Sequence, residues 1–331
     1  MVGERVSDLG ESGLLERVAR GFGEPVAGEV WAGDDAAVVC APQGELFFAI
    51  DTLVEGIDFD LAYCSGADVG WKALAANVSD IAAMGGRASS AVVSLLLPSN
   101  APAALVDDLI EGLAAAGQIW DVNVVGGDIS GAPQVSLSVA IVGSPPGPVA
   151  LRSGAKAGDA ICVTGSLGGA AGGLALLRSG WPAVPPQAAL ERLRARQLRP
   201  RARAAEGVAL AAFATAMIDV SDGLAVDLDN LMSASGTGCE VDPKSLPVDP
   251  DLIAAQDVLA DGPLHLAITG GEDFELLFTI PEKGLDGARA ALGPAGPAVT
   301  RIGTVTEGTK KLGDLPVGEW KERGWEHLRE S

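Results

Sequence analysis

Acidic side chains recur along this chain at the ends of short apolar runs. In residues 216–224, such a run leads to Asp219, and Ser221 and Asp222 follow before an amphipathic stretch begins. The pattern predicts a buried strand, a tight corner and a helix. Ser221 or Asp222 could cap that helix, and its first amides could face an anion. The corner could hold a metal ion and a phosphate, or its acids could serve only as caps.

Four further acids stand in comparable places, beside glycines, at predicted strand ends or on a helix face. Together they form one candidate metal-binding set: Asp34, Asp51, Asp80, Asp128, Asp219 and Asp222. If these carboxylates converge, their mutual repulsion requires cations between them. Mg²⁺ suits such a set, because it prefers oxygen ligands and shares itself with substrate phosphates.

Other chemistries find little support in the residues. The only histidines are His265 and His327, too few for a Ser-His-Asp system or a zinc triad. The P-loop and protein-kinase motifs are absent. The glycine-rich stretch 165–173 resembles a phosphate cradle, but close helix packing explains it equally well. Phosphoryl transfer by positioning and metal electrostatics remains, and it needs no strong base if the acceptor is a phosphate monoester.

The elements that would position these residues mix without strict alternation, which favours an α+β fold. Predicted helices cover residues 11–22, 70–84, 102–118, 170–177, 190–199 and the segment from 224, and predicted strands cover 36–39, 45–50, 91–97, 122–125, 135–142, 159–164, 216–219, 266–269, 275–280 and 301–305. The linker candidate 143–148 separates two predicted domains, 1–147 and 148–331. The most basic stretch, residues 190–199 together with Arg201 and Arg203, is most simply a solvated face.

Composition narrows the class of protein. Of the 331 residues 48% are apolar, so a sizeable core can form. The net charge of −21 argues against nucleic acid or an anionic membrane as partner. Four scattered cysteines indicate neither a zinc site nor a disulfide framework. With no signal peptide and no long apolar run, we expect a cytoplasmic protein.

Taken together, seven motifs identify a family. They occur in this order: Gly33–Ala37, Asp51–Gly56, Lys72–Gly85, Gly126–Asp128, Arg152–Lys156, Ile218–Leu224 and Gly270–Leu276. In this set and order the chain resembles the thiamine-monophosphate kinases of the aminoimidazole-ribonucleotide-synthetase-like superfamily. The resemblance runs from about residue 10 to about residue 328.

The resemblance implies Mg²⁺-dependent, ATP-dependent phosphorylation of thiamine monophosphate to thiamine diphosphate by direct in-line transfer. It assigns the six acids above to Mg²⁺. It assigns Gly127, Asp128, Arg152 and Ser221 to ATP, and Asp58, Glu272 and Trp325 to the substrate. It also implies a two-domain α+β fold, in which an N-terminal sheet domain dimerises and a C-terminal α/β domain completes the ATP and substrate site. The expected assembly is a homodimer.

Two departures from the family pattern leave alternatives open. Ala49 and Ile50 stand where the family usually has Ser or Thr, and Asp58 stands where it usually has His. One alternative is therefore a superfamily relative that activates another substrate with ATP. Another is a non-catalytic protein that binds thiamine phosphate or a nucleotide, although the complete set of acids argues against it.

Overall fold

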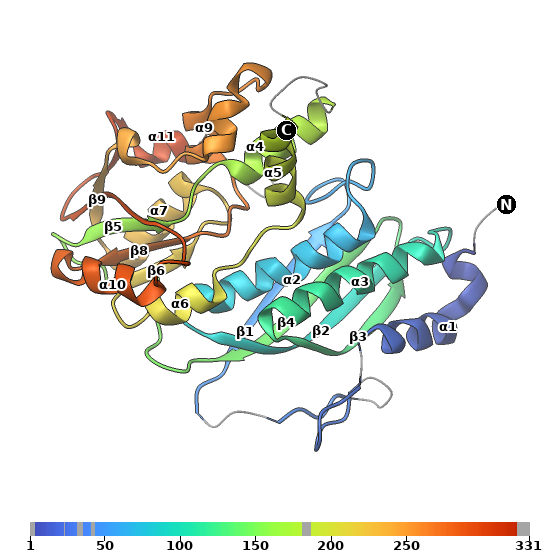
Figure 1. Ribbon diagram of the computed structural model, residues 1–331. Helices are drawn as coiled ribbons and strands as arrows, with labels where there is room; N and C mark the ends of the chain where they lie inside the picture. Colours follow the sequence, from blue (N-terminus) through green and yellow to red (C-terminus); the bar gives the residue numbers. More distant parts are fainter. Residues whose placement is uncertain (1–3, 23, 32–35, 41–43, 181–186, 323–331) are drawn as a thin grey trace. The chain divides into compact units, whose positions relative to one another are not determined.

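The computed structural model describes residues 4–22, 24–31, 36–40, 44–180 and 187–322 (Figure 1). The chain divides into two compact units. The first comprises Met1–Ile81 and Arg87–Pro145, and the second comprises Ala82–Gly86 and Pro146–Ser331.

The first unit is built on a four-stranded sheet in the order β1-β4-β2-β3. Its helices and strands are α1 (Val6–Gly21), β1 (Phe47–Val54), α2 (Gly66–Ala83), β2 (Arg87–Leu97), α3 (Ala103–Trp120), β3 (Asn123–Gly131) and β4 (Ser136–Ser144). Helices α2 and α3 lie side by side over one face of the sheet (Figure 1). They approach closely at glycines, because a Cβ on Gly112 would lie 2.0 Å from the backbone oxygen of Ala67.

The opposite face of this sheet carries exposed apolar side chains. Burial alternates along β4, as expected for a strand with one covered face. On the other face, Phe48 is 74% exposed, Ile50 66% and Val92 42%. Ile50 pairs with Ala140, which in turn pairs with Val92, so these residues form a continuous row across three strands.

The second unit contains a seven-stranded sheet in the order β11-β10-β7-β9-β5-β8-β6. Its strands are β5 (Ala160–Thr164), β6 (Ala216–Asp219), β7 (Gly238–Val241), β8 (Leu276–Ile280), β9 (Val299–Thr306), β10 (Lys310–Leu312) and β11 (Leu315–Pro316). Its helices are α4 (Gly169–Ser179), α5 (Gln187–Leu198), α6 (Ala204–Leu210), α7 (Leu224–Ser235), α8 (Pro250–Ala254), α9 (Pro263–Thr269), α10 (Leu285–Leu292) and α11 (Val317–Lys321), with short 3₁₀ turns at Pro243–Ser245, Gln256–Val258 and Glu282–Gly284.

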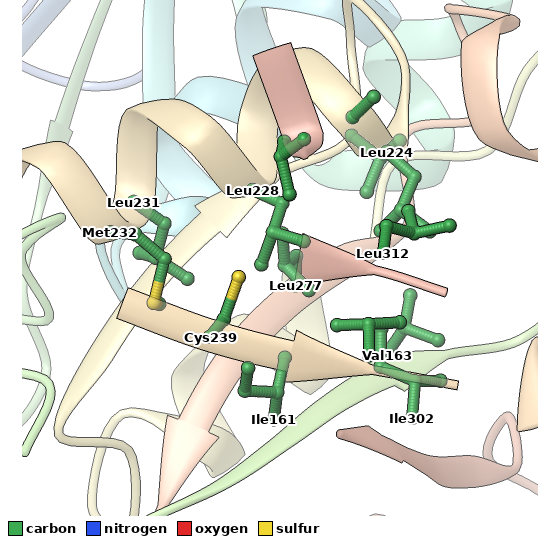
Figure 2. Packing of buried hydrophobic residues seen from close by; sticks show 14 of the residues in the cluster. Ile161, Val163, Leu224, Leu228, Leu231, Met232, Cys239, Leu277, Ile302 and Leu312 are labelled. Carbon is green, nitrogen blue, oxygen red and sulfur yellow. The ribbon is translucent and has the colours of Figure 1, made fainter. Parts of the chain in front are cut away.

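Both faces of the centre of this sheet are buried, which explains its continuous apolar strands. On one face, Ile161 and Val163 pack with the α7 residues Leu224 and Leu228 (Figure 2). On the other face, Cys162 belongs to a separate cluster with residues of α6 and α10. A third cluster joins α4, α5, α8 and α9.

Most predicted elements are present, and four differ. The strand predicted at 122–125 extends as β3 through Gly127 and Asp128 to Gly131. Residues 266–269 belong to helix α9, not to a strand, because Pro263 opens a helix there and a four-residue apolar run does not distinguish the two. The strand predicted to end at residue 50 continues through Asp51 to Val54. Within the described part of 36–39, only an isolated bridge from Val38 to Val30 forms. None of the helices in the described ranges has the length and apolarity of a membrane span.

Candidate functional site

The corner after β6 places three acids close together in the second unit. Asp219 ends β6 and is only 2% exposed. Helix α7 begins after Gly223, whose φ of 106° brings its Cα close to the backbone oxygens of Thr269 and Gly270. The cap differs from the prediction, because neither Ser221 nor Asp222 caps the helix with its side chain.

Asp227 is the residue of this corner that the sequence analysis missed. Its Oδ2 atom accepts hydrogen bonds from the amides of Ser221 and Asp222, both at 3.1 Å. Those two amides are therefore occupied by the Asp227 carboxyl group and are not available to a bound phosphate. Burial, followed by the nearby charges of Asp219 and Asp222, raises the pKa of the Asp227 carboxyl well above its usual range. The sequence signal for this role was the position of Asp227 on the first turn of the helix, six residues after Ser221.

The Gly270–Leu276 motif runs directly against this corner. The amide of Glu272 donates to the backbone oxygen of Ser221 at 2.8 Å, and that of Phe274 donates to Val220 at 2.9 Å. Gly271 must be a glycine, because a Cβ there would lie 2.4 Å from the Ser221 oxygen. The structure thus brings Glu272 and the Asp219–Asp222 corner together within one unit.

The other acids of this motif hold the protein together. Asp273 is buried, and its carboxylate accepts the amides of Gly168 at 2.6 Å and Ala170 at 3.1 Å. These amides belong to the N-cap and the first turn of α4, within the glycine-rich stretch, so the carboxylate takes donors that a phosphate cradle would offer. Burial raises the pKa of Asp273 to about 7, although both amides oppose this shift.

The basic stretch is solvated only in part: Arg192, Arg194, Arg199 and Arg201 are exposed, whereas Arg196 and Arg203 are partly buried. Arg203 forms a two-pronged ion pair with buried Glu275, at 2.7 and 2.5 Å. Arg196 on α5 contacts buried Asp249 at 2.9 Å and donates to Ser166 at 2.9 Å. These cations tie the glycine-rich loop and the Gly270–Leu276 motif to helices α5 and α6.

Arg152 lies on an exposed segment beside β6. The preceding residue, Leu151, accepts the amide of Met217 at 2.8 Å, and the backbone oxygen of Arg152 accepts the Ser235 hydroxyl at 3.2 Å. The backbone is therefore fixed next to the strand that carries Asp219, while the residue itself is exposed.

In the first unit, Asp51 is tied to α2 through its backbone. Asn77 is fully buried on α2, and its Oδ1 atom accepts the Asp51 amide at 3.1 Å. Its Nδ2 atom donates to the Ala73 oxygen at 2.9 Å, which fixes the orientation of the amide. Asp80 lies three residues further along the same helix and is half-buried. Residues three apart on a helix are neighbours on its surface, so Asn77 and Asp80 share one face of α2.

In the four-stranded sheet, Asp128 belongs to the face opposite to that of Asp51. Asp51 pairs with Val139, in the row that continues through Val93 to Gly127. Asp128 pairs with Ser94 in the next row, and neighbouring residues of a strand point to opposite faces. The structure therefore does not bring Asp51 and Asp128 to one face of this unit. A Cβ on Gly127 would lie 2.0 Å from the Val93 oxygen, which explains the glycine.

Asp58 closes a turn after β1. Its Oδ2 atom accepts the Val54 amide at 2.8 Å, and the buried Lys72 ammonium donates to its backbone oxygen at 3.3 Å. One carboxylate oxygen therefore already serves the local fold.

Two of the predicted site residues, Asp34 and Trp325, lie outside the described residues. Within the described ranges, no three His, Cys, Asp or Glu side chains form a group that could hold a metal ion. Asp219 and Asp222 belong to the second unit, and Asp51, Asp80 and Asp128 belong to the first.

Comparison with known proteins identifies the family. Residues 33–144 match the N-terminal domain of the AIR synthase related proteins, and residues 156–313 match their C-terminal domain. A thiamine-monophosphate kinase of Mycobacterium tuberculosis (strain ATCC 25618 / H37Rv) is 37% identical over 98% of this chain and 93% of its own length. The chain belongs to the thiamine-monophosphate kinase family.

Solved structures agree with this assignment. The thiamine-monophosphate kinase from Stenotrophomonas maltophilia K279a has a TM-score of 0.79 and 34% identity, over 91% of this chain and 95% of that one. AaThiL complexed with AMPPCP and TMP has a TM-score of 0.74 and 32% identity, over 94% and 95%. The predicted family and the predicted two-domain α+β fold are both confirmed.

Proposed function

We propose that this chain transfers the γ-phosphoryl group of ATP to thiamine monophosphate, forming thiamine diphosphate and ADP. Family membership over nearly the whole chain supports the reaction, as does the relative solved with AMPPCP and TMP. The observation that carries the proposal is the backbone hydrogen bond from the Glu272 amide to the Ser221 oxygen, at 2.8 Å. This contact joins the corner assigned to metal and ATP to the residue assigned to the substrate.

We propose Mg²⁺ as the metal. The corner supplies the carboxylates of Asp219 and Asp222, and oxygen ligands suit Mg²⁺. Burial is the main cause of the raised pKa of Asp227, and the negative charges of Asp219 and Asp222 add to it. Bound Mg²⁺ would neutralise charge on the phosphoryl group during transfer. The residues proposed to hold several such ions are Asp34, Asp51, Asp80, Asp128, Asp219 and Asp222.

The remaining assigned residues would bind and orient the two substrates. Gly127, Asp128, Arg152 and Ser221 are proposed for ATP, for which the exposed guanidinium of Arg152 offers a positive charge. Glu272 is proposed for the thiamine end, where a carboxylate complements the cationic thiazolium ring. Asp58 and Trp325 are the further substrate candidates. No general base is needed, because a phosphate monoester is largely dianionic at neutral pH, with a second pKa of about 6.

We further propose a homodimer formed through the open face of the four-stranded sheet. Phe48, Ile50 and Val92 are exposed in one apolar region of this face, and such regions commonly mark protein interfaces. We also propose that the protein acts in the cytoplasm, since all four cysteines lack disulfide partners.

Purified protein, incubated with ATP, Mg²⁺ and thiamine monophosphate, tests the proposal directly. We expect ADP and thiamine diphosphate to form in equal amounts, as measured by chromatography. Release of ADP with another acceptor but not with thiamine monophosphate would show a superfamily relative with a different substrate. Binding without turnover, seen by calorimetry, would indicate a non-catalytic protein.

A further inference from the structure

Gln197, near the end of helix α5, is a buried polar residue that none of the assigned roles uses. It is 3% exposed, and its Nε2 atom donates to the Oε2 atom of Glu272 at 2.7 Å. The two residues are 75 positions apart in the chain. A buried side-chain amide thus holds the carboxylate that we assign to the thiamine end of the substrate.

The rest of α5 fixes the position of Gln197. Gly173 on α4 lies against this helix so closely that a Cβ there would be 2.2 Å from the Leu193 oxygen and 3.0 Å from the Gln197 Cβ. The adjacent Arg196 is anchored on Asp249 at 2.9 Å. The packing of α5 therefore fixes the position of Gln197, and its hydrogen bond orients the Glu272 carboxylate.

Glu272 itself is held in an unusual backbone conformation. Its φ is +67°, a value that residues other than glycine seldom adopt. Such conformations persist where the surroundings over-determine them, and they cluster at functional sites. Here the Glu272 amide is fixed on Ser221 and the side chain is fixed on Gln197.

The other end of the Gln197 amide argues against a purely structural role. Its Nε2 atom is the one that faces the Glu272 carboxylate. The Oε1 atom is then buried without a partner among the described residues. An unpaired buried acceptor is destabilising, so an apolar side chain would serve packing alone better.

We propose that Gln197 is a positioning residue for substrate binding, which orients the Glu272 carboxylate toward the thiamine end of thiamine monophosphate. This inference rests on the proposed function, because it requires Glu272 to contact that substrate. It does not involve ATP, so the two substrates should respond differently when Gln197 is changed.

The test compares Gln197→Leu, Glu272→Gln and the double variant with the wild type. Leucine has a side chain of similar size, but it is apolar and lacks both the Nε2 donor and the unpaired Oε1 atom. We expect Gln197→Leu to raise the KM for thiamine monophosphate about tenfold, with the KM for ATP unchanged. Calorimetry without ATP should show the same loss of thiamine monophosphate affinity, and the Tm should stay equal or rise.

The double variant separates positioning from a general structural effect. If Gln197 acts through Glu272, its replacement adds nothing in the Glu272→Gln background. Gln256→Leu, at an exposed glutamine of the same unit, is the matched control and should leave all constants unchanged. A lower Tm with an unchanged KM, or additive effects in the double variant, would overturn the inference alone. A wild type that neither binds nor phosphorylates thiamine monophosphate would overturn the proposed function and this inference with it.

Discussion

At the scale of single residues, several acids that look equivalent in sequence have different roles in the structure. Asp219 and Asp222 line the corner after β6, whereas Asp227 accepts the corner's backbone amides. Asp273 in turn accepts the amides of the glycine-rich loop. Hydrogen bonds from backbone amides therefore give Asp227 and Asp273 a role in supporting the fold.

Replacing Asp219 by Asn tests the metal assignment. Asparagine keeps the size of the side chain but removes its charge, so we expect turnover to fall below detection while the thermal midpoint changes little. Activity assays and thermal denaturation measure the two effects. Asp286→Asn, at an acid of the same unit whose side chain is 99% exposed, serves as the control. An Asp219→Asn protein that does not fold would show a structural acid.

Replacing Asp273 by Asn tests the effect of burial on a carboxyl group. The folded-state pKa is about 7 and the reference value is 3.8, so the folded protein retains a proton that the unfolded chain has lost between these values. Wild-type stability should therefore fall relative to the variant as pH rises from 3.8 to about 7, and the difference should be constant above that range. Each unit of pKa difference corresponds to about 1.4 kcal/mol. Denaturant unfolding at several pH values measures this, and a pH-independent difference would contradict it.

At the scale of elements, close backbone approaches set the geometry of the site. Gly127 lies where β3 meets β2 so closely that a side chain would overlap the Val93 oxygen, at 2.0 Å. Gly131, at the end of the same strand, has nothing within 4 Å of the position of its Cβ. Substitutions at these two glycines therefore distinguish a steric requirement for glycine from the general cost of glycine in a strand.

Gly127→Ala should destabilise the protein by about 1–3 kcal/mol, because the strands must move apart to admit the methyl group. Gly131→Ala should be neutral or slightly stabilising, since it only reduces the freedom of the unfolded chain. Urea unfolding of both variants provides the comparison. Equal stabilities would mean that the strands yield without cost.

At the scale of the whole molecule, the open sheet face is the feature that predicts an assembly. Ile50 is 66% exposed on this face, and Ile119 is 61% exposed on α3. Both are isoleucines of the first unit, so they form a matched pair for one substitution.

Ile50→Lys should convert the proposed dimer to a monomer, because a charge buried without a partner at an interface is costly. Ile119→Lys should leave the mass unchanged. Sedimentation equilibrium measures both. Since Asp128 belongs to the same face as Ile50, we expect the monomer to lose turnover as well. An unchanged mass for Ile50→Lys would exclude this face as the interface.

Sequence patterns predicted most of the fold because periodicity reports burial locally. The long helices α2 and α3 and the buried strands β5 and β8 follow directly from such patterns. Helix α9 was mistaken for a strand because its buried run is too short to show a period. The partly buried Arg203 cannot be told from its exposed neighbours by sequence, because its partner Glu275 is 72 residues away.

The sequence by itself determined the family, the α+β fold and the candidate acids, since ordered motifs and local periodicity are properties of the chain alone. Only the tertiary structure decided which carboxylates bind backbone amides, that Glu272 meets both Ser221 and Gln197, and that Asp51 and Asp128 belong to opposite faces of one sheet. These facts depend on strand register and on contacts between distant segments. Neither leaves a local trace in the order of residues.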